Sequence, residues 1–278
     1  MKYVVIGAGA AGTSAVKEIL KNRDAEDEIT IITKESVPFY YRPRLIEYLS
    51  GEVEDEELII HDENWFDKNN VNLNLSEEVK EIDFKNKKVI SDKGSYVYDK
   101  LLLANGAHSF VPPINGHDKN NVFTLRNLAD ARKIHQKAKE SDNAVVIGGG
   151  LLGIESASNL RKIGVDVTVI ERSEWCLNRQ LDKKGGRLLI EILEEKKGLK
   201  FALDASTEEF KGNDEVKEVF LGNGDSLKAD LVLLSTGVRS NVELFEDTDL
   251  KIKRAVDVNE YMETNIEDVY AAGDVAEY

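Results

Sequence analysis

Residues 3–12 read YVVIGAGAAG, an apolar run followed at once by the pattern G-x-G-x-x-G, and a helical pattern continues to about residue 22. Gly7 allows a sharp turn out of the predicted strand, Gly9 leaves room for a pyrophosphate, and Gly12 lets the helix pack closely. The free N–H groups of the helix N-terminus then face the phosphates. A plain glycine-rich turn is the alternative, but the order of strand, glycines and helix favours a dinucleotide-binding unit.

The same pattern returns in residues 144–153, AVVIGGGLLG. The helix that follows is expected over residues 151–163, with Gly164 as the residue just beyond its end. Two copies in one chain are much harder to explain as accident than one. They predict two dinucleotides held by two sub-domains, which suits an enzyme that passes a hydride from one nucleotide to the other.

Composition narrows the class of protein. The 278 residues can bury one large core or two medium ones, and 41% hydrophobic with 32% charged residues is ordinary for a globular protein. The net charge of −15 argues against nucleic acid or an anionic membrane as a general partner. An early first strand, one cysteine and no long apolar run favour a cytoplasmic protein without leader, disulfide or membrane span.

An acidic residue is expected after the second strand of each unit, where it binds ribose hydroxyls. In the first unit Lys34 and Glu35 follow that strand, so Glu35 is the candidate unless it is only a solvated charge. In the second unit Glu171 lies 18 residues after Gly153. Its carboxylate would repel a 2′-phosphate, which favours NADH over NADPH. Arg172 weakens this preference, because an arginine can hold that phosphate.

Other segments carry weaker signals. Residues 37–45, VPFYYRPRL, form a stiff loop with flat, cationic surfaces that could flank a planar ring, or an ordinary surface turn. The acidic run of residues 52–57 reads as a solvated face. Further helices are predicted over residues 45–49, 128–139 and 181–197, and strands over residues 199–203, 218–221 and 227–234, with a hairpin turn at 222–225.

Five motifs together resemble the FAD-dependent pyridine nucleotide–disulfide oxidoreductase superfamily over essentially the whole chain. They are the two glycine patterns, the second continuing to Glu155, and the segments LANGA at 103–107, STG at 235–237 and YAAGD at 270–274. The resemblance implies an α/β protein with two Rossmann-like dinucleotide-binding domains, each a three-layer ββα/βα structure with a parallel sheet. The FAD domain would comprise residues 1–110 and 236–278, with the NAD(H) domain, residues 111–235, inserted in it.

The resemblance also assigns roles to single residues. Asp274 would bind the ribityl or pyrophosphate region of FAD, and Asn105 replaces the threonine of the family's Ala-Thr-Gly loop beside the flavin. Glu155 would lie near the nicotinamide and flavin, or be an ordinary helix charge. The expected FAD contacts are Gly7, Gly9, Ala10, Ala11, Gly12, Glu35, Arg42, Val79, Ala104, Asn105, Gly106, Gly273 and Asp274. The expected NADH contacts are Gly148, Gly150, Leu151, Leu152, Gly153, Glu171 and Gly237.

The subfamily is inferred from a motif that this chain lacks. Disulfide reductases carry a Cys-x4-Cys pair beside the flavin, but this chain has no cysteine before Cys176, for which no redox role is expected. The loop with Arg42, Pro43 and Arg44 resembles the Arg-Pro-x-Leu loop of NADH:rubredoxin reductases, related ferredoxin reductases and the flavoprotein part of nitrite reductases. By resemblance these residues lie near the isoalloxazine ring, where they could bias its charge or help seat the acceptor.

The expected activity is therefore transfer of hydride from NADH to FAD, then of electrons to a small iron protein such as rubredoxin or ferredoxin. This scheme needs no metal and no side-chain nucleophile or base, and histidines 61, 108, 117 and 135 read as structural. Family members usually continue into a C-terminal interface domain, which this chain is expected to lack, so that the FAD pocket would be partly open. The alternatives are an NADH oxidase, a nitrite-reductase flavoprotein component, or a nucleotide-binding module without turnover.

Overall fold

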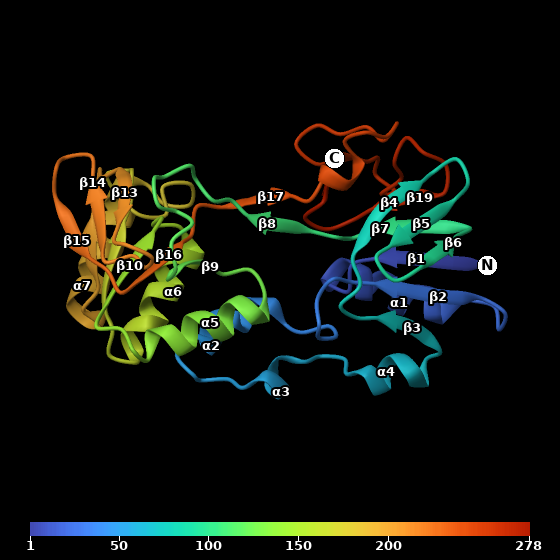
Figure 1. Cartoon of the computed structure of the whole chain (residues 1–278), viewed down its shortest axis with the longest axis horizontal. Coiled ribbons are helices and arrows are strands. Elements are labelled where there is room, and N and C mark those ends of the chain that lie inside the picture. Colours follow the sequence, from blue (N-terminus) through green and yellow to red (C-terminus); the bar gives the residue numbers. More distant parts are fainter. The chain divides into compact units, whose positions relative to one another are not determined.

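The computed structural model describes every residue from 1 to 278, and the chain divides into two compact units (Figure 1). Unit 1 contains residues 1–41, 59–108 and 238–278, and unit 2 contains residues 42–58 and 109–237. The chain therefore leaves unit 1 twice and returns to it twice. None of its helices combines the length and the apolar character that crossing a lipid bilayer requires.

Unit 1 is built on a five-stranded sheet in the order β19-β7-β1-β2-β3 (Figure 1). Every neighbouring pair in this sheet is parallel, so the carboxyl ends of all five strands share one edge. The inner strands are short, mostly apolar runs because both faces of the sheet are buried there, whereas the edge strand β3 reads VNLN and is partly exposed. They are β1 Lys2–Ile6, β2 Glu28–Ile32, β3 Val71–Asn74, β7 Lys100–Leu103 and β19 Val269–Ala271.

Alternate residues of β1 enter two different cores, as the two-residue period of a strand requires. Val5 packs with Val16 of helix α1, Ala10–Asn22, on one face of the sheet. Val4 and Ile6 pack on the other face, beneath three antiparallel strands. These strands are β4 Val79–Asp83, β5 Lys88–Ser91 and β6 Ser95–Val97. The smaller elements are α4 Glu63–Lys68, β8 Ala107–Ser109, β17 Val238–Ser240, η2 Glu243–Phe245, β18 Val256–Asp257 and β20 Ala276–Glu277.

Unit 2 repeats this three-layer plan around a parallel sheet in the order β12-β11-β10-β16-β9 (Figure 1). Helix α6, Leu151–Lys162, packs against β10 and β11, and a three-stranded antiparallel sheet covers the core around Val145 and Val232. The strands are β9 Val122–Thr124, β10 Asn143–Ile147, β11 Asp166–Ile170, β12 Lys200–Ala202, β13 Thr207–Lys211, β14 Glu218–Leu221, β15 Ser226–Lys228 and β16 Leu231–Leu234. The other helices are η1 Arg42–Arg44, α2 Leu45–Tyr48, α3 Asp55–Leu58, α5 Leu128–Ala138 and α7 Lys183–Lys197. The expected fold class, an α/β protein with two Rossmann-like units, is confirmed.

Most predicted elements are present, and two are corrected. The expected single strand over residues 227–234 is wrong, because β15 pairs antiparallel with β14 whereas β16 pairs parallel with β10. The chain must change sheets between them, at Ala229 and Asp230. The helix predicted from Leu181 begins at Lys183, since the Asp182 side chain accepts a hydrogen bond from the Gly185 N–H and caps the helix. Helix α4 had not been expected.

The segment of residues 42–58 packs in unit 2, although its neighbours in sequence lie in unit 1. Its apolar side chains Leu45, Leu49 and Leu58 are buried. Within the acidic run, Glu52 pairs with Lys162 of α6 at 2.7 Å and Asp55 pairs with Arg132 of α5. The interpretation of this run as a merely solvated face is therefore wrong for these two carboxylates, which help to bind the segment to unit 2. The FAD domain predicted over residues 1–110 includes this segment, which the structure groups with unit 2.

Candidate functional site

The glycines after β1 form a corner in which two of them are fixed by the chain itself. Gly7 has φ +107°, and a Cβ added there would lie 2.2 Å from the Ala104 carbonyl oxygen. A Cβ on Gly12 would lie 2.1 Å from the Gly7 carbonyl oxygen. Around Gly9, in contrast, no protein atom lies within 4 Å of the added Cβ. The fold demands Gly7 and Gly12, whereas Gly9 keeps free a space that the protein does not fill.

The corner after β10 has the same geometry. Gly148 has φ +114°, with its added Cβ 2.3 Å from the Ser235 carbonyl oxygen, and that of Gly153 lies 2.0 Å from the Gly148 carbonyl oxygen. Gly150, the counterpart of Gly9, again has no protein atom within 4 Å. Both corners therefore leave an open position at the N-cap residue of a helix, where a pyrophosphate can approach the backbone.

Helices α1 and α6 also differ from the other long helices in their caps. Helix α5 has a full capping box between Asn127 and Asp130, and α7 is capped by Asp182. Helices α1 and α6 have Gly9 and Gly150 as their N-cap residues, which offer no side-chain cap. Their first N–H groups have no partner within the helix, and such groups at a helix N-terminus bind anions. The two corners therefore fit the phosphates of two dinucleotides.

The acidic candidate of unit 1 lies where it was predicted, just past β2. The buried Tyr40 hydroxyl donates to the Glu35 carboxylate at 2.7 Å and holds it in place. Beyond β19, Gly273 has φ +82°, and its added Cβ would lie 3.0 Å from the Cβ of Ala11. The Gly273–Asp274 pair is thus next to the first turn of α1. Ala10 is exposed on that turn, and Asp274 is exposed as well.

Asn105 follows β7 and forms a reciprocal pair with Asn241. Its side-chain Nδ2 donates to the Asn241 carbonyl oxygen at 2.8 Å, and Asn241 Nδ2 donates to the Asn105 carbonyl oxygen at 2.6 Å. The Oδ1 of Asn105 is buried and has no hydrogen-bond partner. Gly106, the next residue, has φ +69° and allows the loop to turn. Ala104 and Asn105 thus lie against the Gly7 corner.

Val79, the remaining expected FAD contact in unit 1, starts β4 and packs against the core around Ile82. Close to it lies a buried carboxylate that the sequence did not single out. Glu77 is only 4% exposed and accepts a hydrogen bond from the Tyr96 hydroxyl at 2.6 Å. Burial, and then this hydrogen bond, raise the pKa of Tyr96 to about 12. The Glu77 N–H donates to Thr33 at the end of β2, so this cluster supports the strand end that carries Glu35.

Glu171 in unit 2 is bonded to the glycine corner itself. Its carboxylate accepts hydrogen bonds from the Gly149 N–H at 2.7 Å and from the Ser173 N–H at 2.8 Å. Arg172, between them in sequence, is exposed. Cys176 is fully buried beside Gly149, and burial together with the charge of Glu171 raises the pKa of its thiol to about 12. Such a thiol stays protonated and unreactive at neutral pH, which supports the expectation that Cys176 has no redox role.

The remaining NADH candidates surround the open position of unit 2. Leu151 and Leu152 are 60% and 42% exposed on the first turn of α6, which leaves apolar surface beside the corner. Gly237 has φ +95° and no protein atom near its added Cβ. Glu155 lies one turn further along α6 and is partly buried. These residues lie at or near the edge of the sheet formed by the carboxyl ends of β10 and β16.

Arg42, Pro43 and Arg44 form the short helix η1, which belongs to unit 2. The Arg42 guanidinium donates to the Arg126 carbonyl oxygen at 2.6 Å, and Arg44 pairs with Glu47 at 2.8 Å. The structure therefore groups the expected FAD contacts at one sheet edge in unit 1, with the exceptions of Arg42, which is in unit 2, and Val79, which is in β4.

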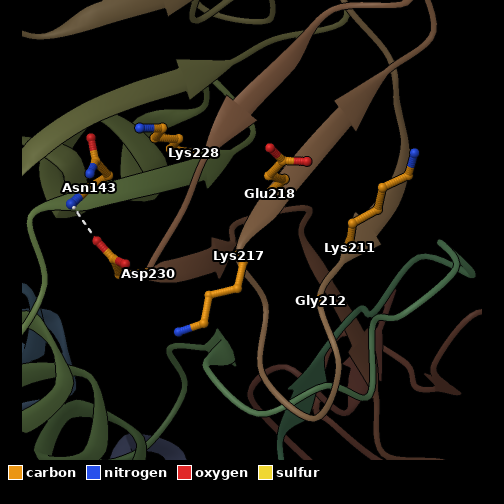
Figure 2. A pocket seen from close by; sticks show the side chains of 7 residues that line it. All are labelled: Asn143, Lys211, Gly212, Lys217, Glu218, Lys228 and Asp230. Carbon is orange, nitrogen blue, oxygen red and sulfur yellow. Dashed lines mark hydrogen bonds between the residues drawn. The ribbon is translucent and has the colours of Figure 1, made fainter.

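A pocket of about 410 Å³ in unit 2 lies at the opposite edge of the sheet, where β10 and β16 begin (Figure 2). Its three lysines are Lys211 at the end of β13, Lys217 just before β14 and Lys228 at the end of β15, and they point in different directions rather than toward a common point (Figure 2). The pocket is therefore at the other end of the sheet from the Gly148–Gly153 corner. Its lining consists of Asn143, Lys211, Gly212, Lys217, Glu218, Lys228 and Asp230.

Each of the four histidines stacks on a neighbouring ring or lies within hydrogen-bond distance of a neighbouring oxygen. His61 stacks on Trp65 with 4.2 Å between ring centroids, and burial lowers its pKa. His117 and His135 bond the carbonyl oxygens of Ile114 and Leu49, at 2.9 and 3.1 Å. His108 lies 2.8 Å from the Asn241 side-chain oxygen. These contacts agree with structural roles.

Two parallel-sheet units, each with an open glycine corner and a carboxylate after its second strand, define a Rossmann-type protein built for two dinucleotides. The sequence pattern of the pyridine nucleotide-disulphide oxidoreductase family matches residues 1–278, and the chain belongs to that family. The sequence analysis expects the rubredoxin-reductase type of this family, which lacks the cysteine pair. The absence of that pair here and the similarity to an NADH-rubredoxin oxidoreductase agree with this expectation.

Known relatives give the same picture. The chain is 39% identical to a nitrite reductase [NAD(P)H] of Bacillus subtilis over 100% of its own length and 34% of that protein. It is 35% identical to an NADH-rubredoxin oxidoreductase of Clostridium acetobutylicum, over 100% of this chain and 68% of the relative. Among solved structures, an NAD-dependent persulfide reductase from A. fulgidus superposes with a TM-score of 0.93 at 34% identity, covering 100% of this chain and 54% of that one. The chain thus spans about a third of the first of these relatives.

Proposed function

We propose that the chain is the nucleotide-binding part of an NAD(P)H-dependent flavoprotein oxidoreductase, with FAD in unit 1 and NADH in unit 2. The observation that carries this proposal is the open central glycine at an uncapped helix N-terminus, which occurs once in each unit. Gly7 and Gly148 have a positive φ and are enclosed by protein, so the fold itself requires glycine there. Gly9 and Gly150 have an ordinary negative φ and open space around them, so their lack of a side chain serves a ligand.

In unit 1 the first turn of α1 would bind the pyrophosphate of FAD, and Glu35, oriented by Tyr40, would bind the adenosine ribose. Asp274 would bind near the ribityl chain, because Gly273 lies against Ala11 at the start of α1. When bound, FAD supplies a ring that accepts hydride from a nicotinamide and can release electrons one at a time. The chain contributes binding and orientation.

In unit 2 the pyrophosphate of NADH would lie on the first turn of α6, and Glu171 would bind the ribose. NADH is preferred over NADPH, because a carboxylate repels a 2′-phosphate. Arg172 is the residue that opposes this preference, since it is exposed and adjacent. Leu151 and Leu152 offer apolar surface at the corner, and Glu155 would lie toward the nicotinamide.

The electron acceptor would be a small iron or iron–sulfur protein such as rubredoxin. Two observations support it: the 35% identity to an NADH-rubredoxin oxidoreductase and the burial of the only cysteine, which has no cysteine partner. Arg42, Pro43 and Arg44 would help to seat the acceptor or bias the charge of the flavin. A role as the flavoprotein part of a nitrite reductase is the second candidate, favoured by the 39% identity to that enzyme.

The test is to add NADH anaerobically to the FAD-loaded chain and to measure flavin absorbance at about 450 nm. Bleaching is expected with NADH, and more slowly with NADPH. The Gly150→Val variant is the matched control, because its side chain would fill the open corner of unit 2 and leave FAD bound in unit 1. Absence of bleaching in the wild-type chain, with both nucleotides bound, would reduce the chain to a binding module without turnover.

The acceptor is tested separately. The NADH-reduced chain is mixed with rubredoxin, ferredoxin or oxygen, and reoxidation of the flavin is followed in each case. Fast reoxidation by rubredoxin is expected. Reoxidation by oxygen alone would identify an NADH oxidase instead. If all three acceptors reoxidise the flavin slowly, the remaining experiment is to add a nitrite-reducing partner protein and follow the same reoxidation.

A further inference from the structure

Helix α7 presents large apolar side chains to solvent on the face that is turned away from the core of unit 2. Its inner face packs through Leu189, Ile190 and Leu193 in a hydrophobic cluster of that unit. On the outer face Leu188 is 54% and Ile192 is 39% exposed. These two residues lie four positions apart and are therefore neighbours on the helix surface. A single exposed leucine is ordinary, but contiguous apolar surface on one face marks an interaction site.

Leu181 and Gly185 extend this surface toward the start of the helix. Leu181 is 36% exposed, and a Cβ added to Gly185 would lie 3.7 Å from the Leu181 Cβ. The nearest side-chain atom to that added Cβ, Asp182 Oδ1, is 3.3 Å away, whereas a Cβ on Gly186 would lie 2.3 Å from the Trp175 ring. The fold thus demands glycine at 186 and much less so at 185, although glycine weakens a helix relative to alanine. A glycine at 185 leaves room for a second helix to approach closely. The apolar row of α7 consists of Leu181, Gly185, Leu188 and Ile192.

The exposed charges beside the apolar row are divided by sign along the helix. Lys184 and Arg187 lie in its first half, and Glu191 and Glu195 lie in its second half. With 3.6 residues per turn, all four lie on one side of the apolar row. This order works against the helix itself, because a lysine in the first turn opposes the helix dipole and two glutamates four positions apart repel each other. The stability of the helix alone therefore does not explain the order of charges.

A second copy of α7, running antiparallel, fits both the apolar row and the charges. In a two-fold contact residue i meets residue j of the other copy, and j meets i. When Leu188 of each copy packs on Ile192 of the other, the axis passes beside residue 190, midway between them. Lys184, six positions before that midpoint, then lies opposite Glu195 of the second copy, five positions after it. The two-fold axis keeps like sides of the two helices together, so opposite charges meet twice.

We infer that the apolar row of α7 is an interaction surface for a second copy of this chain, docked antiparallel about a two-fold axis. The surface is small, with three large apolar side chains on each copy, and interfaces of that kind are weak and transient. The dissociation constant of the dimer should therefore be on the order of 10–100 µM. The inference does not depend on the binding of a nucleotide in either unit.

The experiment is sedimentation equilibrium of the full 278-residue chain at concentrations from about 1 to 500 µM, which bracket that constant. About 0.15 M salt screens the repulsion between two chains of net charge −15. The average mass is expected to rise from 31.1 kDa toward twice that value. Leu188→Lys should hold it near 31.1 kDa throughout, because each dimer would bury two charged groups against apolar surface. Since Leu188 is exposed in the monomer, the variant should unfold in urea as the wild-type chain does.

Exchange of charges tests the antiparallel register. Lys184→Glu alone and Glu195→Lys alone should each weaken the dimer about tenfold, because each brings like charges together at both ends of the contact. The double variant should regain the wild-type dissociation constant. An equimolar mixture of the two single variants should associate equally well, since each supplies the charge that the other lacks.

Lys197→Glu is the matched control, because it makes the same charge change as Lys184→Glu on the opposite side of α7. Its dissociation constant should stay within about twofold of the wild-type value. Three results would overturn the inference. A chain that remains at 31.1 kDa over the whole range excludes a second copy as the occupant. Association that Leu188→Lys leaves unchanged places the contact elsewhere, and single charge variants that neither the double variant nor the mixture rescues exclude the antiparallel register.

Discussion

The two glycine corners are nearly the same backbone built twice. Gly7 and Gly148 share a positive φ and a carbonyl contact from the neighbouring strand end. The corners differ in how the acidic residue is held. In unit 2 Glu171 is hydrogen-bonded to the corner through the Gly149 N–H, whereas in unit 1 Glu35 is held by the Tyr40 hydroxyl. In unit 2 the acid is therefore bonded directly to the glycine corner, and in unit 1 it is bonded to a tyrosine five residues further along the chain.

The residue between the first two glycines of each corner also differs between the units. Unit 1 has Ala8 and unit 2 has Gly149 at the same place in the pattern. A Cβ on Gly149 would lie 2.7 Å from Cys176 Sγ and 3.0 Å from Glu171 Oε2. The close approach of the acid and the thiol leaves no room for alanine. The backbone of the motif is thus shared by both units, and in unit 2 it also donates a hydrogen bond to the acid.

The largest expected effect concerns the shared part of the corners. Gly7→Ala and Gly148→Ala each place a Cβ against a carbonyl oxygen at a positive φ, so each should lower the free energy of unfolding of its own unit by about 4 kcal/mol. Gly9→Ala and Gly150→Ala, where the space is open, should cost less than about 1 kcal/mol.

Each unit contains one tryptophan, Trp65 in unit 1 and Trp175 in unit 2. Urea unfolding followed by fluorescence, in variants that keep only one of them, reports the two units separately. Equal losses at Gly7 and Gly9 would contradict the distinction between a glycine demanded by the fold and one kept for a ligand.

The second effect tests the difference between the corners. Gly149→Ala should destabilise unit 2 by about 2 kcal/mol, because the new methyl group overlaps Cys176 and Glu171. Ala8→Gly should cost unit 1 no more than about 1 kcal/mol. Adding Cys176→Ala to Gly149→Ala removes the closest contact, and the double-mutant cycle should show a favourable coupling. Additive costs would mean that the thiol does not set the limit.

The sequence was sufficient for the parts that depend on local spacing. The corners, helices α1 and α6, and the positions of Glu35 and Glu171 follow from glycine spacing and strand length, and the structure has them there. The hydrogen bond from the Gly149 N–H to the Glu171 carboxylate was not predictable, since it depends on how the chain turns after β11. Nor was the Asn105–Asn241 pair, which joins residues 136 positions apart.

Two other features of the fold were not predicted from the sequence, and each has a physical reason. The break between β15 and β16 has no glycine or proline at residues 229–230 to signal it, because the chain there changes partner strands rather than direction alone. The segment of residues 42–58 packs on unit 2 through long-range pairs such as Glu52 with Lys162. Charge pairs between distant residues leave no trace in a single sequence.

The third effect is smaller and again compares the two acids. Glu171→Gln replaces one of two accepting oxygens by an NH₂ group, which leaves the Gly149 or the Ser173 N–H without a partner and should cost unit 2 about 1–2 kcal/mol. Glu35→Gln should cost unit 1 less than about 0.5 kcal/mol, because the Tyr40 hydroxyl can still donate to the amide oxygen. The measurement is urea unfolding of each unit without nucleotide. A larger loss at Glu35 would reverse the comparison.

The smallest expected effect is a difference between the two units in how their free energy of unfolding depends on pH. Burial raises the pKa of Cys176 from about 9 to about 12, and a thiol whose folded pKa lies above its unfolded value stabilises the fold fully below the unfolded pKa. That contribution declines as pH rises from about 9 toward 12, so unit 2 should lose under about 1 kcal/mol between about pH 8 and 9.5. In unit 1 burial raises the pKa of Tyr98 to about 12 from 10, so its loss starts about one pH unit higher. Cys176→Ala should therefore flatten the pH dependence of unfolding for unit 2, whereas Tyr98→Phe should leave that of unit 1 unchanged in this range. A slope that persists in Cys176→Ala would assign the alkaline loss to another group.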